Sequence, residues 1–132
     1  MSACGLLYAR LNAQVLSVGG RISPDLRRAG DALPCIVYEL QQDVLMEVLG
    51  SPVPRMSVAH MRVHCLADTL IAADALADSV FSALHAVGWT SGGSTAHIAV
   101  VRGRSGGVLE DDRPDGLDLA REIILDLDLT HS

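Results

Sequence analysis

The sequence contains no lysine, and all ten of its basic residues are arginine. This absence excludes a P-loop lysine, a Schiff-base lysine and a serine–lysine catalytic dyad. Sixteen acidic residues outnumber the ten arginines and give the chain a formal net charge of −6. Because proteins that coat a nucleic-acid duplex are normally basic, this charge disfavours general DNA or RNA binding.

Aromatic residues are also scarce, at 3% of the chain, although 49% of the residues are hydrophobic. The mean hydropathy of +0.32 is therefore carried mainly by alanine, valine and leucine. A chain of 132 residues has the usual length of one domain, and we expect a single domain over residues 1–132 with a substantial core. The apolar excess predicts apolar surface left over for partners.

Cysteine is sparse, and membrane or targeting segments are not evident. Cys4, Cys35 and Cys65 are an odd number without C-x-x-C spacing, which favours free thiols in a reducing compartment.

Residues 1–20 lack the basic start and continuous apolar run of a signal peptide. The longest stretch without Asp, Glu or Arg, residues 79–101, is interrupted by His and Gly, so it does not predict a membrane helix. We expect a soluble protein.

Hydrophobic spacing predicts two helices separated by strands. Residues 5–18 have a helical apolar stripe that ends at Gly19-Gly20, and a second helix is predicted to begin after Asp68 and to end at Gly88. The residues expected on the apolar face of this second helix are Ile71, Ala75, Ala77, Val80, Phe81, Leu84 and Val87. Both helices are amphipathic enough to pack on a sheet.

Alternation of apolar and polar residues predicts a half-buried strand over residues 56–67. In this strand His60, Arg62 and His64 share one face and the apolar side chains share the other. Further strands are predicted over 33–40, 43–49, 96–102, 108–111 and 118–130, with a tight turn at 103–107. The fold class expected from this order is α+β, with a mainly antiparallel sheet packed against one long central helix and an N-terminal helix.

A G-x-S-x-G pentapeptide at residues 103–107 follows a predicted strand. In hydrolases this motif holds a nucleophilic serine on a strand-to-helix turn, and here Ser105, an aspartate of the last strand and His131 follow in the order of such a triad. However, residues 108–114 predict a strand and a turn instead of a helix, and His131 is the penultimate residue, where chains fray. A glycine-rich hairpin turn is therefore the favoured interpretation.

Acidic residues form a partial match to a calcium-binding loop. Asp111, Asp115, Gly116 and Glu122 lie at loop positions one, five, six and twelve. Position three is Arg113, a cation where the ion requires an oxygen, and no predicted helix pair flanks the loop. The pattern favours a solvated acidic turn over a cation site.

Histidine and cysteine side chains are common metal ligands, so a metal site is a further hypothesis. His60 and His64 share a strand face but lie ~13 Å apart along it, four residues at ~3.3 Å each. This separation is too large for one ion within a subunit, and Cys65 points to the other face. We therefore expect no metal, and a polar or interface face that carries His60, Arg62 and His64. No G-x-G-x-x-G opens a predicted helix, so no nucleotide cofactor is expected either.

Several segments follow one another in an order that is more informative than any short motif. In chain order they are Leu6-Leu7 in a leading helix, Gly20-Arg21-Ile22, residues 33–38 (LPCIVY), residues 61–69 (MRVHCLADT), a helix over 72–84 and a closing strand over 119–129. This arrangement covers nearly the whole chain. It resembles the phage tail completion family, also described as tail terminator or head–tail joining proteins.

The resemblance implies a structural virion protein of a phage or phage-like particle that caps the tail tube as an oligomeric ring, expected to be a hexamer, and joins it to the head or neck. Its partners would be further copies of itself, the tail tube protein and the head-completion protein of the neck. DNA would pass through the ring without specific binding, and no catalytic residue, cofactor or membrane contact is implied. The protein would reside in the virion, and in the host cytoplasm during assembly.

Charged residues offer candidates for contacts between ring subunits or with the tube. They are His60, Arg62, His64, Arg102, Arg104, Asp111, Asp112, Arg113 and Asp115. Ordinary solvation of these charges is the alternative interpretation, because exposed ion pairs contribute only ~0–1 kcal/mol each. Two other functions stay open at this stage: a small ligand- or peptide-binding module, and a serine hydrolase that uses Ser105.

Overall fold

The computed structural model describes residues 2–25, 32–46, 56–108 and 121–132. The elements, in chain order, are α1 (Ala3–Gln14), a 3-10 turn (Leu16–Val18), β1 (Ile22–Pro24), β2 (Cys35–Met46), β3 (Met56–Ala67), α2 (Leu70–Leu84), β4 (Val87–Ser91), β5 (Ser94–Val108) and β6 (Arg121–His131). None of the helices in the described ranges is both long and apolar enough to cross a membrane.

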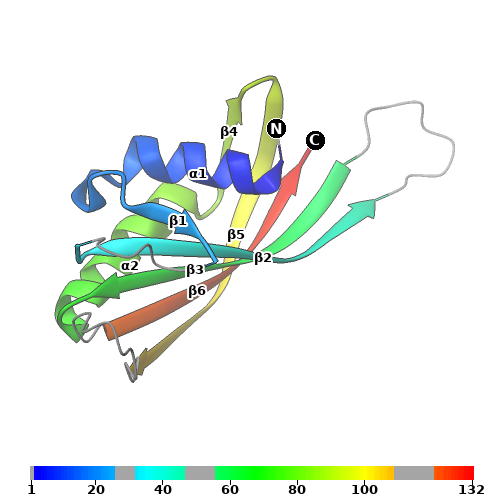
Figure 1. Cartoon of the computed structure of the whole chain (residues 1–132). Helices are drawn as coiled ribbons and strands as arrows, with labels where there is room; N and C mark the ends of the chain where they lie inside the picture. Colours follow the sequence, from blue (N-terminus) through cyan, green and yellow to red (C-terminus); the bar gives the residue numbers. More distant parts are fainter. Residues whose placement is uncertain (1, 26–31, 47–55, 109–120) are drawn as a thin grey trace, which may run out of the picture.

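The described strands form one six-stranded sheet in the order β1-β2-β3-β6-β5-β4. The short β1 pairs in parallel with β2, and the other neighbouring strands pair antiparallel. Both helices, of 12 and 15 residues, lie on the same face of the curved sheet (Figure 1). The expected α+β class with a mainly antiparallel sheet is confirmed.

The first helix is shorter than its apolar stripe predicts. Ser2 caps α1, since its hydroxyl accepts a hydrogen bond from the N–H of Gly5. At Val15 the backbone leaves the helical region, with φ −105° and ψ 86°. The chain then closes a 3-10 turn and ends it at Gly19, which adopts the left-handed conformation that favours glycine. Val15 and Val18 are nevertheless buried, so the predicted stripe continues through two different local structures.

The second helix begins one residue later and ends earlier than predicted. Thr69, and not Asp68, is the N-cap, because the Thr69 hydroxyl accepts a hydrogen bond from the N–H of Ala72. The helix ends at Leu84, and the chain turns directly into β4. Gly88 therefore lies in a strand, where a Cβ would come within 2.6 Å of the carbonyl oxygen of His97.

The apolar face predicted for α2 is only partly right. Ile71 is 85% exposed and Phe81 is 39% exposed, while the Phe81 ring stacks on His85 with 4.6 Å between ring centroids. The residues that α2 buries are Ala73, Leu76, Ala77, Val80, Ala83 and Leu84. Three of these six residues are alanines, whose small side chains allow a helix to pack close to a sheet.

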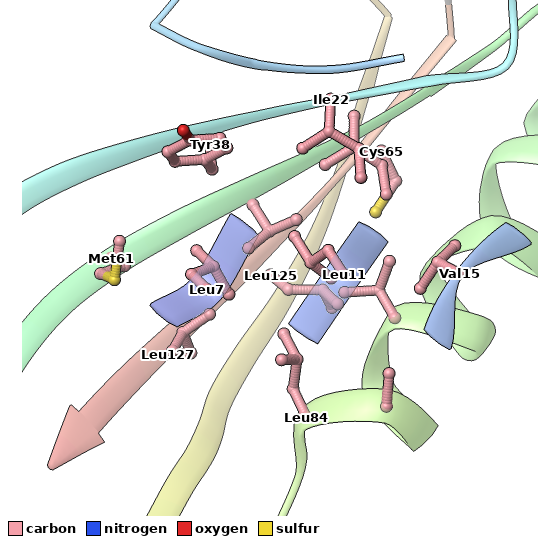
Figure 2. Packing of buried hydrophobic residues seen from close by; sticks show 14 of the residues in the cluster. Leu7, Leu11, Val15, Ile22, Tyr38, Met61, Cys65, Leu84, Leu125 and Leu127 are labelled. Carbon is pink, nitrogen blue, oxygen red and sulfur yellow. The ribbon is translucent and has the colours of Figure 1, made fainter. Parts of the chain in front are cut away.

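The core lies between the helices and the sheet, where side chains of both layers interdigitate (Figure 2). The strand face toward the helices supplies Met61, Val63 and Cys65 from β3. Its neighbour β6 supplies Ile123, Leu125, Leu127 and Leu129 in alternation. The alternation predicted for residues 56–67 is confirmed.

Two predicted breaks in the sheet are wrong. Residues 103–107 do not form a tight turn, because β5 runs without interruption from Ser94 to Val108. Gly103 lies opposite Asp126, and a Cβ at Gly106 would come within 3.2 Å of Ile123 Cδ1. Gly106 therefore makes room for a neighbouring side chain within a strand.

The strands predicted over 33–40 and 43–49 are likewise joined. They form the single strand β2 up to Met46, with a bulge between Leu40 and Gln42. The predicted strand at 109–111 and the start of the last strand at 118–120 lie outside the described residues.

We predict that Leu125→Ala lowers the free energy of unfolding by ~2–5 kcal/mol, because Leu125 is fully buried in the centre of β6 and truncation leaves a cavity. The matched control is Ile71→Ala, since Ile71 is almost fully exposed and its loss is expected to change stability by no more than ~0.5 kcal/mol. Urea unfolding followed by circular dichroism measures both. Equal losses in the two variants would contradict this core.

Candidate functional site: a charged face of the sheet

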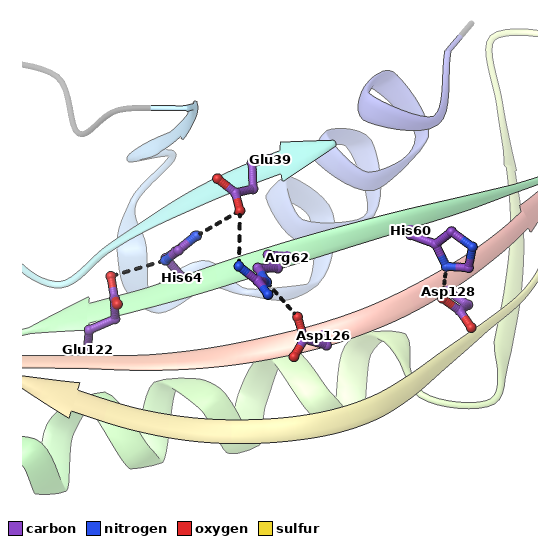
Figure 3. A network of polar contacts seen from close by, with 7 residues as sticks. All are labelled: Glu39, His60, Arg62, His64, Glu122, Asp126 and Asp128. Carbon is purple, nitrogen blue, oxygen red and sulfur yellow. Dashed lines mark hydrogen bonds and ion pairs between the residues drawn. The ribbon is translucent and has the colours of Figure 1, made fainter. Parts of the chain in front are cut away.

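Charged side chains gather on the face of the sheet that the helices leave uncovered. We call this the charged face and define it by Glu39 of β2, His60, Arg62 and His64 of β3, Arg102 of β5, and Glu122, Asp126 and Asp128 of β6. Figure 3 shows most of these side chains in contact with one another. Three of the sequence-predicted interface residues, His60, Arg62 and His64, lie at its centre.

The strand pairing explains why these charges meet. Successive side chains of a strand point to opposite faces, so each apolar residue sent to the core by β3 or β6 is followed by one on the charged face. In the register of the two strands His60 lies opposite Asp128 and Arg62 lies opposite Asp126. Directly opposed charges of opposite sign stabilise such a pair of strands.

Arg62 lies between two carboxylates. Its Nε donates a hydrogen bond of 2.8 Å to Asp126 Oδ1 on β6, and its Nη1 is 3.9 Å from Glu39 Oε1 on β2. The guanidinium therefore connects three neighbouring strands across the charged face. The Arg62 side chain is 43% exposed, so it still presents a cation to solvent or to a partner.

His64 is the most enclosed cation of this face. Its Nδ1 is 3.1 Å from Glu122 Oε2, and its Nε2 is 3.8 Å from Glu39 Oε1. The hydrogen bond to Glu122 raises the pKa of His64, and the nearby charges of Glu122 and Glu39 act in the same direction, while partial burial opposes them. The structure thus favours the protonated imidazolium at this position.

Asp128 joins the other end of the charged face to β5. Its Oδ1 pairs with Nδ1 of His60, and its Oδ2 accepts a hydrogen bond of 2.9 Å from Nη1 of Arg102. Arg102 keeps 61% of its side chain exposed. A shallow open depression of about 750 Å³ lies here, between Gln41 and Gln42 on β2 and Arg102 on β5.

The charged face contains four carboxylates, two guanidiniums and two imidazoles, and each cation named above contacts a carboxylate. This arrangement neutralises charge and orders side chains. It also presents an open, polar surface whose net charge depends on the protonation of His64. Such a surface suits contact with another macromolecule better than enclosure of a small substrate.

Of the other sequence-predicted residues, the structure describes only Arg104, which is not part of this face. Arg104 points to the helix side, where its Nη1 donates a 2.7 Å hydrogen bond to Asp78 and its Nη2 pairs with Asp74. These two carboxylates raise the pKa of Arg104, and the contact ties β5 to α2. Asp111, Asp112, Arg113 and Asp115 lie outside the described residues.

The structure contradicts the serine-hydrolase arrangement. Ser105 lies within the continuous strand β5 opposite Ile124, whereas His131 pairs with Asp43 at 3.0 Å. His131 is seven residues beyond Ile124 on β6, a separation of ~23 Å at ~3.3 Å per residue. Ser105 is therefore not held on a strand-to-helix turn, and the triad proposed from chain order does not form.

The cysteines and histidines do not combine either. Cys65 is buried on the core face, and burial raises the pKa of its thiol to about 12, so the thiolate that binds metals is disfavoured. His60 and His64 contact different carboxylates. Within the described ranges, no three His, Cys, Asp or Glu side chains are grouped so that they could hold a metal ion.

Sequence analysis identified the basic half of the charged face but not its acidic partners. Glu39, Glu122, Asp126 and Asp128 emerge only from strand pairing, because the ion pairs to β6 join residues 58 to 68 positions apart in the chain. A signal was present in the sequence. His60, Arg62 and His64 share one strand face, and Glu122, Asp126 and Asp128 share one face of the last strand, which is the pattern of two strands with complementary charges.

We predict that Glu122→Gln lowers the pKa of His64, measured by NMR titration of the imidazole, because the main cause of the upward shift is removed. A raised folded-state pKa stabilises the fold fully below the unfolded value of ~6.5, and this stabilisation is lost as pH rises through the folded value. The stability lost in Glu122→Gln should therefore be largest below pH ~6.5 and shrink above it.

Asp68→Asn is the control for this titration, since it removes one exposed carboxylate outside the contacts of His64. Its His64 titration is expected to match that of the unchanged protein. An identical His64 titration in Glu122→Gln and in the unchanged protein would refute the assigned contact.

Comparisons with known proteins agree with the fold and with the resemblance seen in the sequence. Residues 6–124 match the family model of the tail completion protein gp17, and no curated protein matches the chain. Among solved structures, a chain of the virion of a native gene transfer agent particle has the same fold. The TM-score is 0.62 at 14% sequence identity, over 96% of this chain and 92% of that one. Because the family model spans most of the sequence, the chain belongs to the family of the tail completion protein gp17 and is a structural protein of a virion tail.

Proposed function

We propose that this chain closes the end of a phage or phage-like tail tube as an oligomeric ring, expected to be a hexamer, and joins the tail to the head or neck. The observation that carries the proposal is the family match over residues 6–124. The fold shared with a chain of a gene transfer agent virion supports it. The partners proposed are further copies of the chain, the tail tube protein and the head-completion protein of the neck.

The surface of the subunit supports an assembled state. Large hydrophobic side chains that are at least one third exposed are Tyr8, Leu16, Leu40, Val44, Leu45, Leu70, Ile71, Phe81, Ile98 and Val100. They are spread over both helices and over strands at both sides of the sheet. A ring subunit has to bury such residues against neighbours on two sides and against the tube, whereas a binding module with one ligand needs only one apolar site.

The charge of the chain supports passage of DNA without specific binding. The net charge of −6 repels the phosphate backbone. On the charged face, Arg62, His64 and Arg102 each pair with a carboxylate, and the negative charge of these carboxylates offsets the attraction of the three cations for phosphates. A ring built from such subunits lets a DNA molecule through and does not hold it.

The role proposed here is positional and needs no bond-making step. The polar side chains of the charged face orient one another and present a defined surface. Ser105 lies opposite Ile124, away from His131, which pairs with Asp43. The position is expected to be the virion, at the junction of tail and head, with assembly in the host cytoplasm.

Light scattering of the purified protein over a wide concentration range tests the ring. We predict a species near six subunits, either at high protein concentration or after addition of purified tail tubes. The physical reason is that weak contacts which close a ring become favourable when concentration or a template brings the subunits together.

A protein that stays monomeric at every concentration and fails to bind tail tubes would contradict the proposal. The alternative of a small ligand- or peptide-binding module predicts that behaviour instead. It also predicts a melting temperature that rises with a ligand, so a thermal-shift screen on the same sample distinguishes the two functions.

A further inference from the structure

Two strands have long edges that face away from the sheet. β1 covers the edge of β2 only at Ile36–Tyr38, and β2 continues to Met46. On the other side β4 covers β5 only up to Ala99, and β5 continues to Val108. Figure 1 shows β1 beside only the first part of β2. Within the part of the chain that the structure describes, no strand pairs with these two remaining edges.

We define the β2 edge as residues 39–45 and the β5 edge as residues 100–106. Backbone N–H and C=O groups that face outward along a strand edge pair readily with another chain. Outward-facing groups of β2 do pair where β1 is present, since the N–H of Ile36 donates to Arg21 and the carbonyl of Tyr38 accepts from Asp25. The bulge between Leu40 and Gln42 interrupts this alternation, and on either side of the bulge outward-facing backbone groups are available to a further strand.

The start of the β5 edge is partly protected. The N–H of Val101 donates a hydrogen bond to Nδ1 of His85, which limits where an added strand can begin. Beyond Val101 the edge carries Arg102 and the small residues at positions 103, 105 and 106. Small residues allow the close backbone approach that an added strand requires.

The two edges carry opposite charges. The β2 edge contains Glu39 and Asp43 and no cation, whereas the β5 edge contains Arg102 and Arg104 and no acid. Pairing two β2 edges or two β5 edges brings like charges together, which is unfavourable across strands. Each of these four side chains also has an ion-pair partner within its own chain. Pairing a β2 edge with a β5 edge nevertheless brings segments of opposite formal charge together, so contact between unlike edges is favoured over contact between like edges.

Exposed apolar side chains concentrate on the same strands. Leu40, Val44 and Leu45 of β2 and Ile98 and Val100 of β5 are between 37% and 45% exposed. They account for half of the exposed large hydrophobic residues of the described chain. A strand added at either edge would cover part of this apolar area, as cross-strand pairs do within a sheet.

The strand directions fix how two copies can meet. Three successive antiparallel pairings, β2 with β3, β3 with β6 and β6 with β5, make β2 and β5 run in opposite directions. When a copy is rotated about an axis along the strands, its β2 edge therefore meets the β5 edge of its neighbour in antiparallel orientation. The registers put Glu39 level with Gly103 and Gln42 level with Val100, so residues 39–42 and 100–103 are the uncovered parts of the two edges that meet without a shift along the strands. A contact between two different surface patches repeats from copy to copy and closes into a ring when the rotation fits.

We propose that the β5 edge of one copy pairs antiparallel with the β2 edge of the next copy, so that the sheets of neighbouring subunits join into one continuous wall. This inference rests on the proposed ring and assigns its subunit contact. The helices then lie on one side of the wall and the charged faces lie on the other. Arg102 is placed where it can contact both Asp128 of its own chain and an acidic residue of the neighbouring β2 edge.

Cross-linking tests the proposal in a background of Cys4→Ala, since Cys35 and Cys65 are buried. One variant combines Gln41→Cys on the β2 edge with Ser105→Cys, and a second combines Gln41→Cys with Val100→Cys. The two β5 positions lie at either end of that edge. A bis-maleimide of ~10 Å, about two strand spacings, therefore covers the registers that the two edges allow.

We expect at least one double variant to give a ladder of covalent multimers in the preparation that light scattering shows to be a ring. Neighbouring subunits place the two cysteines at ~mM effective concentration, so the yield should exceed that of random collisions at ~10 µM protein by ~100-fold. The matched control combines Gln41→Cys with Ala13→Cys, an exposed position on α1. It should give only the random level.

Each other outcome overturns the inference. Covalent dimers from Gln41→Cys alone would show that two β2 edges meet, and dimers from either β5 cysteine alone would show that two β5 edges meet. A ring that forms without cross-links overturns the edge pairing and leaves the proposed function standing. Absence of any ring, with and without tail tubes, overturns both. Circular dichroism of each variant confirms that it is folded before cross-linking.

Discussion

The antiparallel pairing of β3 with β6 is the interaction on which the rest of this structure depends. Eleven residue pairs join the two strands along their length. On one face the pairing brings Val63 next to Leu125 and so builds the centre of the core. On the other face it brings Arg62 next to Asp126 and so builds the charged face. One strand register therefore determines both the stability of the subunit and the surface that it presents.

The same alternation constrains where the subunit can meet partners. The helices occupy the apolar face and close the core, so the partners proposed for the ring are left with the charged face, the outer helix surfaces and the sheet edges. The carboxylates of the charged face already pair with the basic side chains there. This face is therefore polar and contributes less to binding between subunits than the sheet edges do. The edges of β2 and β5 instead combine open backbone groups, exposed apolar side chains and opposite charges. A division between a polar wall and adhesive edges suits a ring around a passage.

Local pattern was sufficient for much of the fold. The strand over residues 56–67, its two faces and the existence of both helices follow from period alone, and the α+β class follows from their order. The tail completion resemblance rested on that same order, and the family match confirms it. The predictions that failed were the positions of turns and of the ends of strands. Gly103 and Gly106 favour a turn in sequence, but in the structure both lie within β5, where Gly106 leaves room for Ile123.

Other features required information that a single sequence does not carry. β4 is only five residues long and follows α2 almost directly, so Val87 was assigned to the predicted helix and no strand was predicted over residues 89–91. Ile71 and Phe81 match the helical period, yet the alanines and leucines of α2 face the sheet. The acidic partners of Arg62 and His64 come from a strand about 60 positions later. Their contact depends on which strands become neighbours, and that is decided by packing of the whole chain.

Electron cryo-microscopy of assembled particles tests the central claim most directly. The account predicts a closed ring of this chain between the last tail-tube ring and the neck, with the sheet of each subunit bordering the sheet of the next. Density for this chain that is absent from the junction of tail and head, or that shows isolated subunits without mutual contact, would contradict it.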